Sequence, residues 1–99
     1  MVKREIKWTS RALSDRTDIL EYWYDRTGSV DYSVKLQELF TATTRLFSKM
    51  PDAGKEFDQA RNIRFVIIKY YRIYYTYTDQ DFVVLSIWDT RRNQKSFNI

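Results

Sequence analysis

The chain has 99 residues, enough for one hydrophobic core and too few for two, so we expect a single domain over residues 1–99. With 17 Lys and Arg against 13 Asp and Glu, the formal net charge of +4 favours an anionic partner without naming it. Cys and His are both absent, which excludes disulfide frameworks and thiolate metal sites and argues against a zinc enzyme. We therefore predict no cofactor and no metal. No apolar run approaches the roughly 20 residues of a membrane span, and the first residues lead into no signal core, so the expected location is the cytoplasm, with no membrane partner.

The first half of the chain predicts a short strand followed by two helices. Residues 3–8 can alternate as a strand, and Thr9 or Ser10 is placed to cap a helix that continues to about Arg26. The apolar face of this helix has helical spacing and consists of Ala12, Ile19, Leu20 and Trp23. Gly28 ends the helix, and Ser29 can cap the next one.

The second helix is predicted from another stripe at helical spacing, made of Tyr32, Leu36, Leu39, Phe40, Thr43 and Phe47. Met50 precedes Pro51, and the residue before a proline resists the helical conformation, so the helix should stop there. The two helices should form an antiparallel hairpin.

In the second half the hydrophobic period changes from 3.6 to 2. Residues 52–59 are polar and are predicted to be a loop. Three segments rich in β-branched and aromatic residues follow, at 63–68, 70–78 and 82–88, with a tight turn at 78–81. The order strand, helix, helix and three antiparallel strands predicts a two-layer α+β domain, with the helical pair covering one face of the sheet.

Alternation along the strands predicts what each face of the sheet carries. On the middle strand, one face would present Tyr71, Ile73, Tyr75 and Tyr77, and the other Tyr70, Arg72, Tyr74 and Thr76. On the last strand, Val83, Leu85 and Ile87 would meet the helices, opposite Phe82, Val84, Ser86 and Trp88. We therefore expect an open second face with Arg72, Tyr74, Ser86 and Trp88, and with Arg91 and Arg92 just past its edge. Exposed rings among arginines are suited to stacking bases and gripping phosphates.

Each of these features also has a purely structural explanation. Strand packing is a commoner role than a base platform for the tyrosines between Tyr70 and Tyr77. A structural ion pair explains Arg72 as well as a ligand contact does. The cluster at the end of the last strand, from Asp89 to Lys95, can be a solvated strand end, and so can Arg61 and Arg64.

The sequence resembles the RelE/ParE superfamily of toxins from bacterial type II toxin-antitoxin pairs. The resemblance rests on Ser10-Arg-Ala-Leu-Ser-Asp with Ile19 and Tyr22, on Tyr-Arg-Ile-Tyr-Tyr at 71–75, and on an apolar strand that runs into Trp-Asp-Thr-Arg-Arg-Asn at 88–93. It covers nearly the whole chain. It implies a growth-inhibiting toxin that is neutralised by a cognate antitoxin. RelE-like members cleave mRNA in the ribosomal A site, whereas ParE-like members poison DNA gyrase and are not nucleases.

The resemblance also implies roles for single residues if the chain is a nuclease. The arginine of the Tyr-Arg-x-x-Tyr strand and one after the final strand would serve the scissile phosphate, which assigns catalytic roles to Arg72 and to Arg91 or Arg92. The RNA-binding residues would be Arg61, Arg64, Tyr74, Trp88, Lys95 and Phe97. The tail offers neither the His nor the Tyr that some relatives use, and a Tyr or Lys base would need its pKa lowered from about 10 toward 7. An obvious proton shuttle is therefore missing.

Three functions stay open at this point. The first, which Arg72 and the arginine pair favour, is a ribosome-dependent, metal-independent endoribonuclease with the ribosome and mRNA as partners. The second is a gyrase poison that acts through surface contacts. The third is a non-toxic RNA- or protein-binding module on the same fold. In the toxin readings an acidic, partly disordered antitoxin segment would cross the sheet or the helical pair, and no sequence-specific DNA contact is expected, because no helix looks like a recognition helix.

Overall fold

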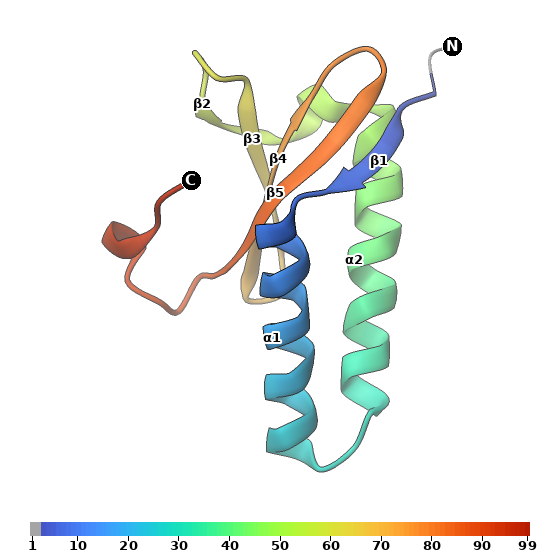
Figure 1. Ribbon diagram of the computed structural model, residues 1–99, viewed down its shortest axis with the longest axis vertical. Helices are drawn as coiled ribbons and strands as arrows, with labels where there is room; N and C mark the ends of the chain where they lie inside the picture. The colour runs from blue at the N-terminus through green and yellow to red at the C-terminus, as the bar shows by residue number, and fades with distance from the viewer. Residues whose placement is uncertain (1–2) are drawn as a thin grey trace.

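The computed structural model describes residues 3–99 and has two layers, a pair of antiparallel helices and a five-stranded sheet (Figure 1). In chain order the elements are β1 (Glu5–Trp8), α1 (Ser10–Thr27), α2 (Asp31–Lys49), η1 (Pro51–Ala53), β2 (Lys55–Asp58), β3 (Ile63–Ile68), β4 (Tyr71–Tyr77), β5 (Asp81–Asp89) and η2 (Gln94–Ser96). The predicted α+β class, the helical hairpin and the three-stranded meander are confirmed. Within residues 3–99, both helices lack the long apolar stretch that a helix needs to cross a bilayer.

The strand order in the sheet is β1-β5-β4-β3-β2. Strands β2, β3, β4 and β5 pair antiparallel in succession, whereas β1 lies parallel to β5, with Glu5 opposite Asp81 and Trp8 opposite Val84. The chain therefore begins and ends its sheet on two neighbouring strands, and the helices fill the connection between β1 and the meander.

One strand was not predicted. Residues 55–58, expected to lie within a loop, form β2, which pairs with β3 through Lys55 opposite Phe65 and Glu56 opposite Arg64. The segment is polar because it is an edge strand, and charged side chains on an edge discourage pairing with other chains. A bulge at Phe57 breaks its alternation further, so that the local sequence pattern of a strand is lost.

Local signals set most of the helix ends. The Thr9 hydroxyl accepts a hydrogen bond from the Ala12 amide at 3.0 Å and caps α1, and Gly28 closes that helix in the left-handed conformation with φ of 70°. The second cap differs from the prediction. Val30 occupies the N-cap of α2. Ser29 lies one residue before the N-cap, and its hydroxyl accepts a hydrogen bond from the Asp31 amide at 3.1 Å. The helix ends before Pro51 as predicted.

The main core lies between the helices and the sheet. Its buried members are Ala12, Leu36, Phe40, Tyr71, Ile73, Tyr75, Phe82, Val84 and Ile87. The stripe predicted for α2 supplies the two helix residues Leu36 and Phe40, while Leu39 and Phe47 are partly buried against the same cluster. The predicted inward face of β4 is confirmed for Tyr71, Ile73 and Tyr75, and Tyr77 is partly buried against the same cluster.

A bulge in β5 changes the predicted faces of that strand. Tyr74 pairs with Ser86 while Tyr75 pairs with Val84, so Leu85 is an extra residue without an opposite partner. Because of it, Val84 packs toward the helices with Phe82, whereas Leu85 packs against the cluster on the other face. The expectation that Val83, Leu85 and Ile87 form one helix-facing row is therefore correct only for Ile87.

Candidate functional site

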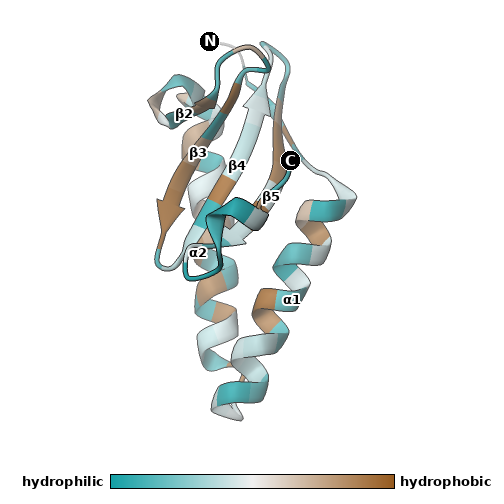
Figure 2. Cartoon of the chain, turned by 90° about the vertical axis from the view of Figure 1, so that its left-hand side faces the viewer, coloured by the Kyte–Doolittle hydropathy of each residue, from teal (hydrophilic) through white to brown (hydrophobic). Residues whose placement is uncertain are grey.

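The second face of the sheet carries the predicted rings, but it is not open. Ile63, Phe65, Tyr74 and Trp88 form a buried cluster there, and Phe97 and Ile99 of the C-terminal segment pack against it. Tyr74 is 0% exposed and Trp88 is 5% exposed. Figure 2 shows the short helix η2 lying in front of the strands. The expectation of an uncovered face is wrong, because the chain covers it with its own last residues.

Phe97 is the main contact of this covering segment. Its ring stacks on Tyr74 with centroids 4.3 Å apart, and it meets Trp88 at 4.9 Å and Phe57 at 5.8 Å. The guanidinium of Arg11 lies 5.4 Å from the same ring. Phe97, which we expected to bind RNA, therefore stacks on the protein itself.

Hydrogen bonds fix the rest of the segment at three points. The Gln94 amide donates to the Tyr74 hydroxyl at 3.2 Å. Arg11 donates to the carbonyl oxygen of Asn98, and Arg61 donates to that of Ile99 at 2.9 Å. Two of these donors, Arg11 and Arg61, come from α1 and from the turn between β2 and β3, so the end of the chain joins elements that are far apart in sequence.

Arg72 lies on this covered face, opposite Trp88 in the strand register. Its guanidinium is 4.6 Å from the centroid of Phe65, and its Nη1 donates to the Tyr74 hydroxyl at 3.3 Å. Among residues 3–99 no carboxylate forms an ion pair with it, and its buried Nε has no hydrogen-bond partner. The structural ion pair considered from the sequence is thus not formed.

Ser86, also expected on an open face, is buried and serves the fold. Its hydroxyl donates to Asp15 Oδ2 at 2.7 Å, and the Ile87 amide donates to the same oxygen at 3.1 Å. β1 pairs with only four residues of β5, and the Asp15 carboxylate of α1 supplies the hydrogen-bond acceptor for the backbone amide of Ile87 beyond them.

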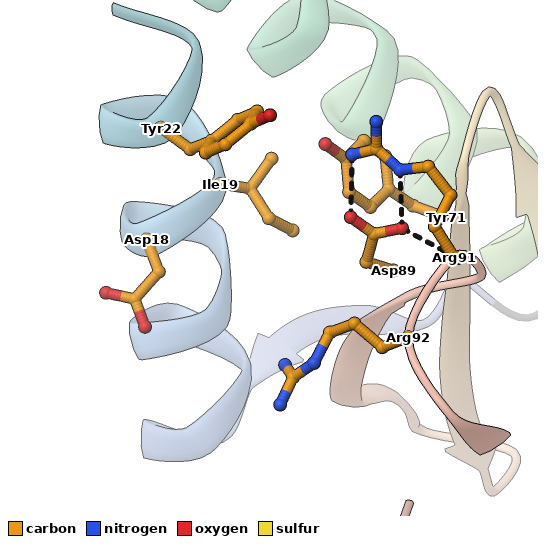
Figure 3. Close-up of a pocket in the computed structure, with 7 residues that line it drawn as sticks. All are labelled: Asp18, Ile19, Tyr22, Tyr71, Asp89, Arg91 and Arg92. Atoms are coloured by element: carbon orange, nitrogen blue, oxygen red, sulfur yellow. Dashed lines mark hydrogen bonds and ion pairs between the residues drawn. The ribbon is translucent and has the colours of Figure 1, made fainter. Parts of the chain in front are cut away.

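The two arginines after β5 separate. Arg92 is exposed and places its guanidinium 4.2 Å from the centroid of Trp88, which makes it a neighbour of the covered face. Arg91 instead binds Asp89 through two contacts, at 2.7 and 3.0 Å, and lies 4.6 Å from the centroid of Tyr70. Figure 3 shows the two side chains pointing in different directions. Lys95 is exposed in η2, and its backbone amide donates to Asn93 Oδ1 at 3.0 Å.

The Asp89–Arg91 pair stands at a hollow of about 350 Å³ between α1 and the end of β5 (Figure 3). Helix α1 contributes Asp18, Ile19 and Tyr22 to its lining, and the sheet and tail contribute Tyr71, Asp89, Arg91 and Arg92. The hydrogen bond from Arg91 lowers the pKa of Asp89 and, from the other side, raises the pKa of Arg91. Both groups therefore stay charged through the neutral range, and the hollow has an ionic rim and an apolar floor.

Arg61 and Arg64 do not join Arg72. Arg64 lies opposite Tyr75, hence on the helix-facing side, where its Nη1 donates to the Gly54 carbonyl at 2.8 Å and its Nη2 is 3.6 Å from Glu56. Arg61 binds Asp58 at 2.6 Å in the turn before β3. The structure thus brings together Arg72, Tyr74, Trp88, Phe97 and Arg92. It places Arg64 on the other face and Arg91 beside the hollow, and Arg61 reaches only the Ile99 carbonyl at the end of the covering segment.

Two buried tyrosines have hydroxyls that are poorly suited to accept a proton at neutral pH. Burial raises the pKa of Tyr71, whose hydroxyl accepts from Trp23 Nε1 at 2.7 Å. Burial also raises the pKa of Tyr75 to about 12, and its hydroxyl donates to the Pro51 carbonyl at 2.5 Å. A general base would need a shift in the opposite direction.

Sequence reasoning missed several residues of these sites. Arg11 looked like one of many polar positions on an exposed helix face, and Phe57 was a lone ring in a polar segment. Gln94 and Asp18 carry no signal in one sequence, since amides and carboxylates of this kind are ordinary on surfaces. Only the contacts across the fold reveal them.

Comparisons with known proteins agree with the fold. Residues 6–94 match the family described as ParE toxin of type II toxin-antitoxin system, parDE. Among solved structures, a chain of the chromosomal ParDE TA system from P. aeruginosa aligns with a TM-score of 0.73 and 13% identity, covering 90% of this chain and 98% of that one. Comparison with curated proteins gives no match. Because the family match spans most of the sequence, the predicted resemblance is confirmed, and the chain belongs to the ParE toxins of type II toxin-antitoxin systems.

Proposed function

We propose that this chain is the toxin of a pair with a cognate antitoxin, and that the free toxin arrests growth by poisoning DNA gyrase through surface contacts. The RelE-like alternative, ribosome-dependent mRNA cleavage, is the other function that the superfamily allows. The two differ in what they demand of the protein. Cleavage needs a base, an acid and positive charge around one phosphate, whereas a poison needs only an exposed surface complementary to its target.

The observation that carries this choice is the covering of the face on which a nuclease would hold the phosphate. Arg72 is half-buried on that face and donates to the Tyr74 hydroxyl. Of the two arginines after β5, Arg92 lies near this face, whereas Arg91 is held by Asp89 beside the hollow on the α1 side. Arg72 also faces Trp88, a ring that the tail covers. These positions support a protein-binding function over a phosphate-centred one.

A direct assay distinguishes the two functions. Purified gyrase, supercoiled plasmid and ATP are incubated with the toxin, and linear DNA is quantified after protein removal. In parallel, transcripts in a translation extract are mapped by primer extension. We expect linear plasmid and no codon-specific cuts. Codon-specific cuts that disappear in Arg72→Ala, without linear plasmid, would overturn the gyrase proposal and establish the nuclease instead.

The antitoxin partner is supported by the family and by charge. The chain carries a net +4, and the rim of the hollow between α1 and β5 combines Arg91, Arg92 and the half-exposed ring of Tyr22. Tyrosine and arginine are the residue types that most often dominate binding energy at protein interfaces. We expect an acidic antitoxin segment to protect the backbone of α1 or of the sheet in hydrogen exchange, and growth arrest on induction without antitoxin. Normal growth would instead favour the non-toxic binding module.

A further inference from the structure

The C-terminal segment, residues 93–99, crosses the sheet face with few of its own side chains buried. Of its seven side chains only Phe97 and Ile99 are partly buried, and the other five are exposed. Figure 1 shows the segment leaving the end of β5 as an open arch before the chain turns back over the sheet. Segments with few buried apolar contacts open more readily than the core of the same protein.

The socket for Phe97 is built by the sheet, not by the segment. Tyr74 of β4, Trp88 of β5 and Phe57 of β2 surround the ring. Because three separate strands supply these rings, the socket does not depend on the segment for its shape. Phe97 therefore behaves as a plug inserted into a preformed aromatic site.

The covered state leaves polar groups unsatisfied. Trp88 Nε1 and Arg72 Nε, on residues that face each other across β4 and β5, are buried without a hydrogen-bond partner. The Tyr74 hydroxyl nearby already accepts from both Arg72 and Gln94. The covered face thus holds two buried donors without an acceptor, a cost that opposes the favourable burial of the Phe97 ring.

We propose that residues 93–99 are a strap that opens locally, without unfolding of the sheet, and so controls access to the face formed by Arg72, Tyr74 and Trp88. When the strap lifts, this face offers hydrogen-bond donors beside apolar rings. The strap does not depend on which target the toxin attacks.

Hydrogen exchange measured by NMR on the full chain tests the strap. The indole N–H of Trp88 reports opening of the strap, and the amide of Ile73, in the central strand β4, reports unfolding of the sheet. We expect the Trp88 proton to exchange by a route that low urea concentrations leave unchanged, while exchange at Ile73 accelerates with urea. Exchange of both protons with the same urea dependence would overturn the proposal, because the face would then open only when the sheet unfolds.

Two variants sharpen the test. Phe97→Ala removes the plug and should raise the exchange rate of the Trp88 indole, measured without urea, by about tenfold. The plug contacts are lost both when the strap opens and when the sheet unfolds, so exchange at Ile73 should rise by the same factor and its urea dependence should stay. Lys95→Ala, at an exposed position in the same segment, should leave both rates unchanged. A Trp88 rate in Phe97→Ala equal to that of the unmodified chain would refute the strap.

Discussion

Replacing Gly54 with Ala is expected to dislodge a buried tyrosine. The backbone at Gly54, with φ of −71° and ψ of 163°, suits alanine, so the substitution introduces no conformational strain of its own. The added Cβ would lie 2.9 Å from Tyr75 Cζ and closer still to the hydroxyl. Tyr75 cannot retreat easily, because it is 0% exposed and stacks on Phe82 with centroids 4.6 Å apart.

The magnitude follows from three contributions. Overpacking of a tight core costs about 1–3 kcal/mol. If the Tyr75 hydroxyl leaves the Pro51 carbonyl, the two buried groups lose their hydrogen bond at a cost of about 1–3 kcal/mol. The reduced entropy of the unfolded chain returns about 0.4–1 kcal/mol. We therefore expect Gly54→Ala to lower the free energy of unfolding by roughly 1–5 kcal/mol.

A double-mutant cycle in urea separates the clash from other effects. Tyr75→Phe removes the hydroxyl, so Gly54→Ala should cost less in the Tyr75→Phe background than in the unmodified chain, with a coupling of about 0.5–3 kcal/mol. Unfolding is followed by circular dichroism for the four proteins. Strictly additive losses, or a Gly54→Ala variant as stable as the unmodified chain, would refute the reasoning.

Two further predictions concern carboxylates. Asp15→Ala leaves the buried Ser86 hydroxyl and the Ile87 amide without their acceptor. It should lower the free energy of unfolding by about 2–3 kcal/mol, measured as a shift of the urea midpoint. An unchanged midpoint would contradict the role given to Asp15. Asp89 has its pKa lowered in the folded state by Arg91, so its contribution to stability is present above the unfolded pKa of about 3.9 and is lost as the pH falls through the lower folded value. Asp89→Asn should therefore show a shallower loss of stability with acid than the unmodified chain, and identical acid profiles would disprove the linkage.

The predictable part of the fold is the part that local chemistry controls. Thr9 caps a helix because its hydroxyl meets an amide three residues on, and Gly28 ends one because only glycine takes that φ readily. Pro51 stops the next for the same local reason. Such signals lie within a few residues of the structure that they determine, so a single sequence reveals them.

The parts that could not be predicted depend on contacts between distant residues. The bulge at Leu85 is invisible in an apolar run that alternates equally well in either register, and only the pairing of Tyr74 with Ser86 fixes it. In the candidate site, the placement of Arg72 and Trp88 on one face followed from the strand pattern, but the capture of Arg91 by Asp89 did not. The covering by Phe97 was equally hidden, because one ring in a polar tail looks solvated until its partners are known.

The parallel pairing of β1 with β5 has a consequence for how the protein is made. Glu5 is synthesised well before its strand partner Asp81, because the two helices and three strands lie between them in the sequence. Arg4 likewise can donate its hydrogen bond to the carbonyl of Thr78 only after Thr78 has been synthesised. Because pairings between residues far apart in the sequence form slowly, this edge of the sheet stays unpaired until β5 has been made. A nascent chain interrupted before β5 therefore has no complete sheet.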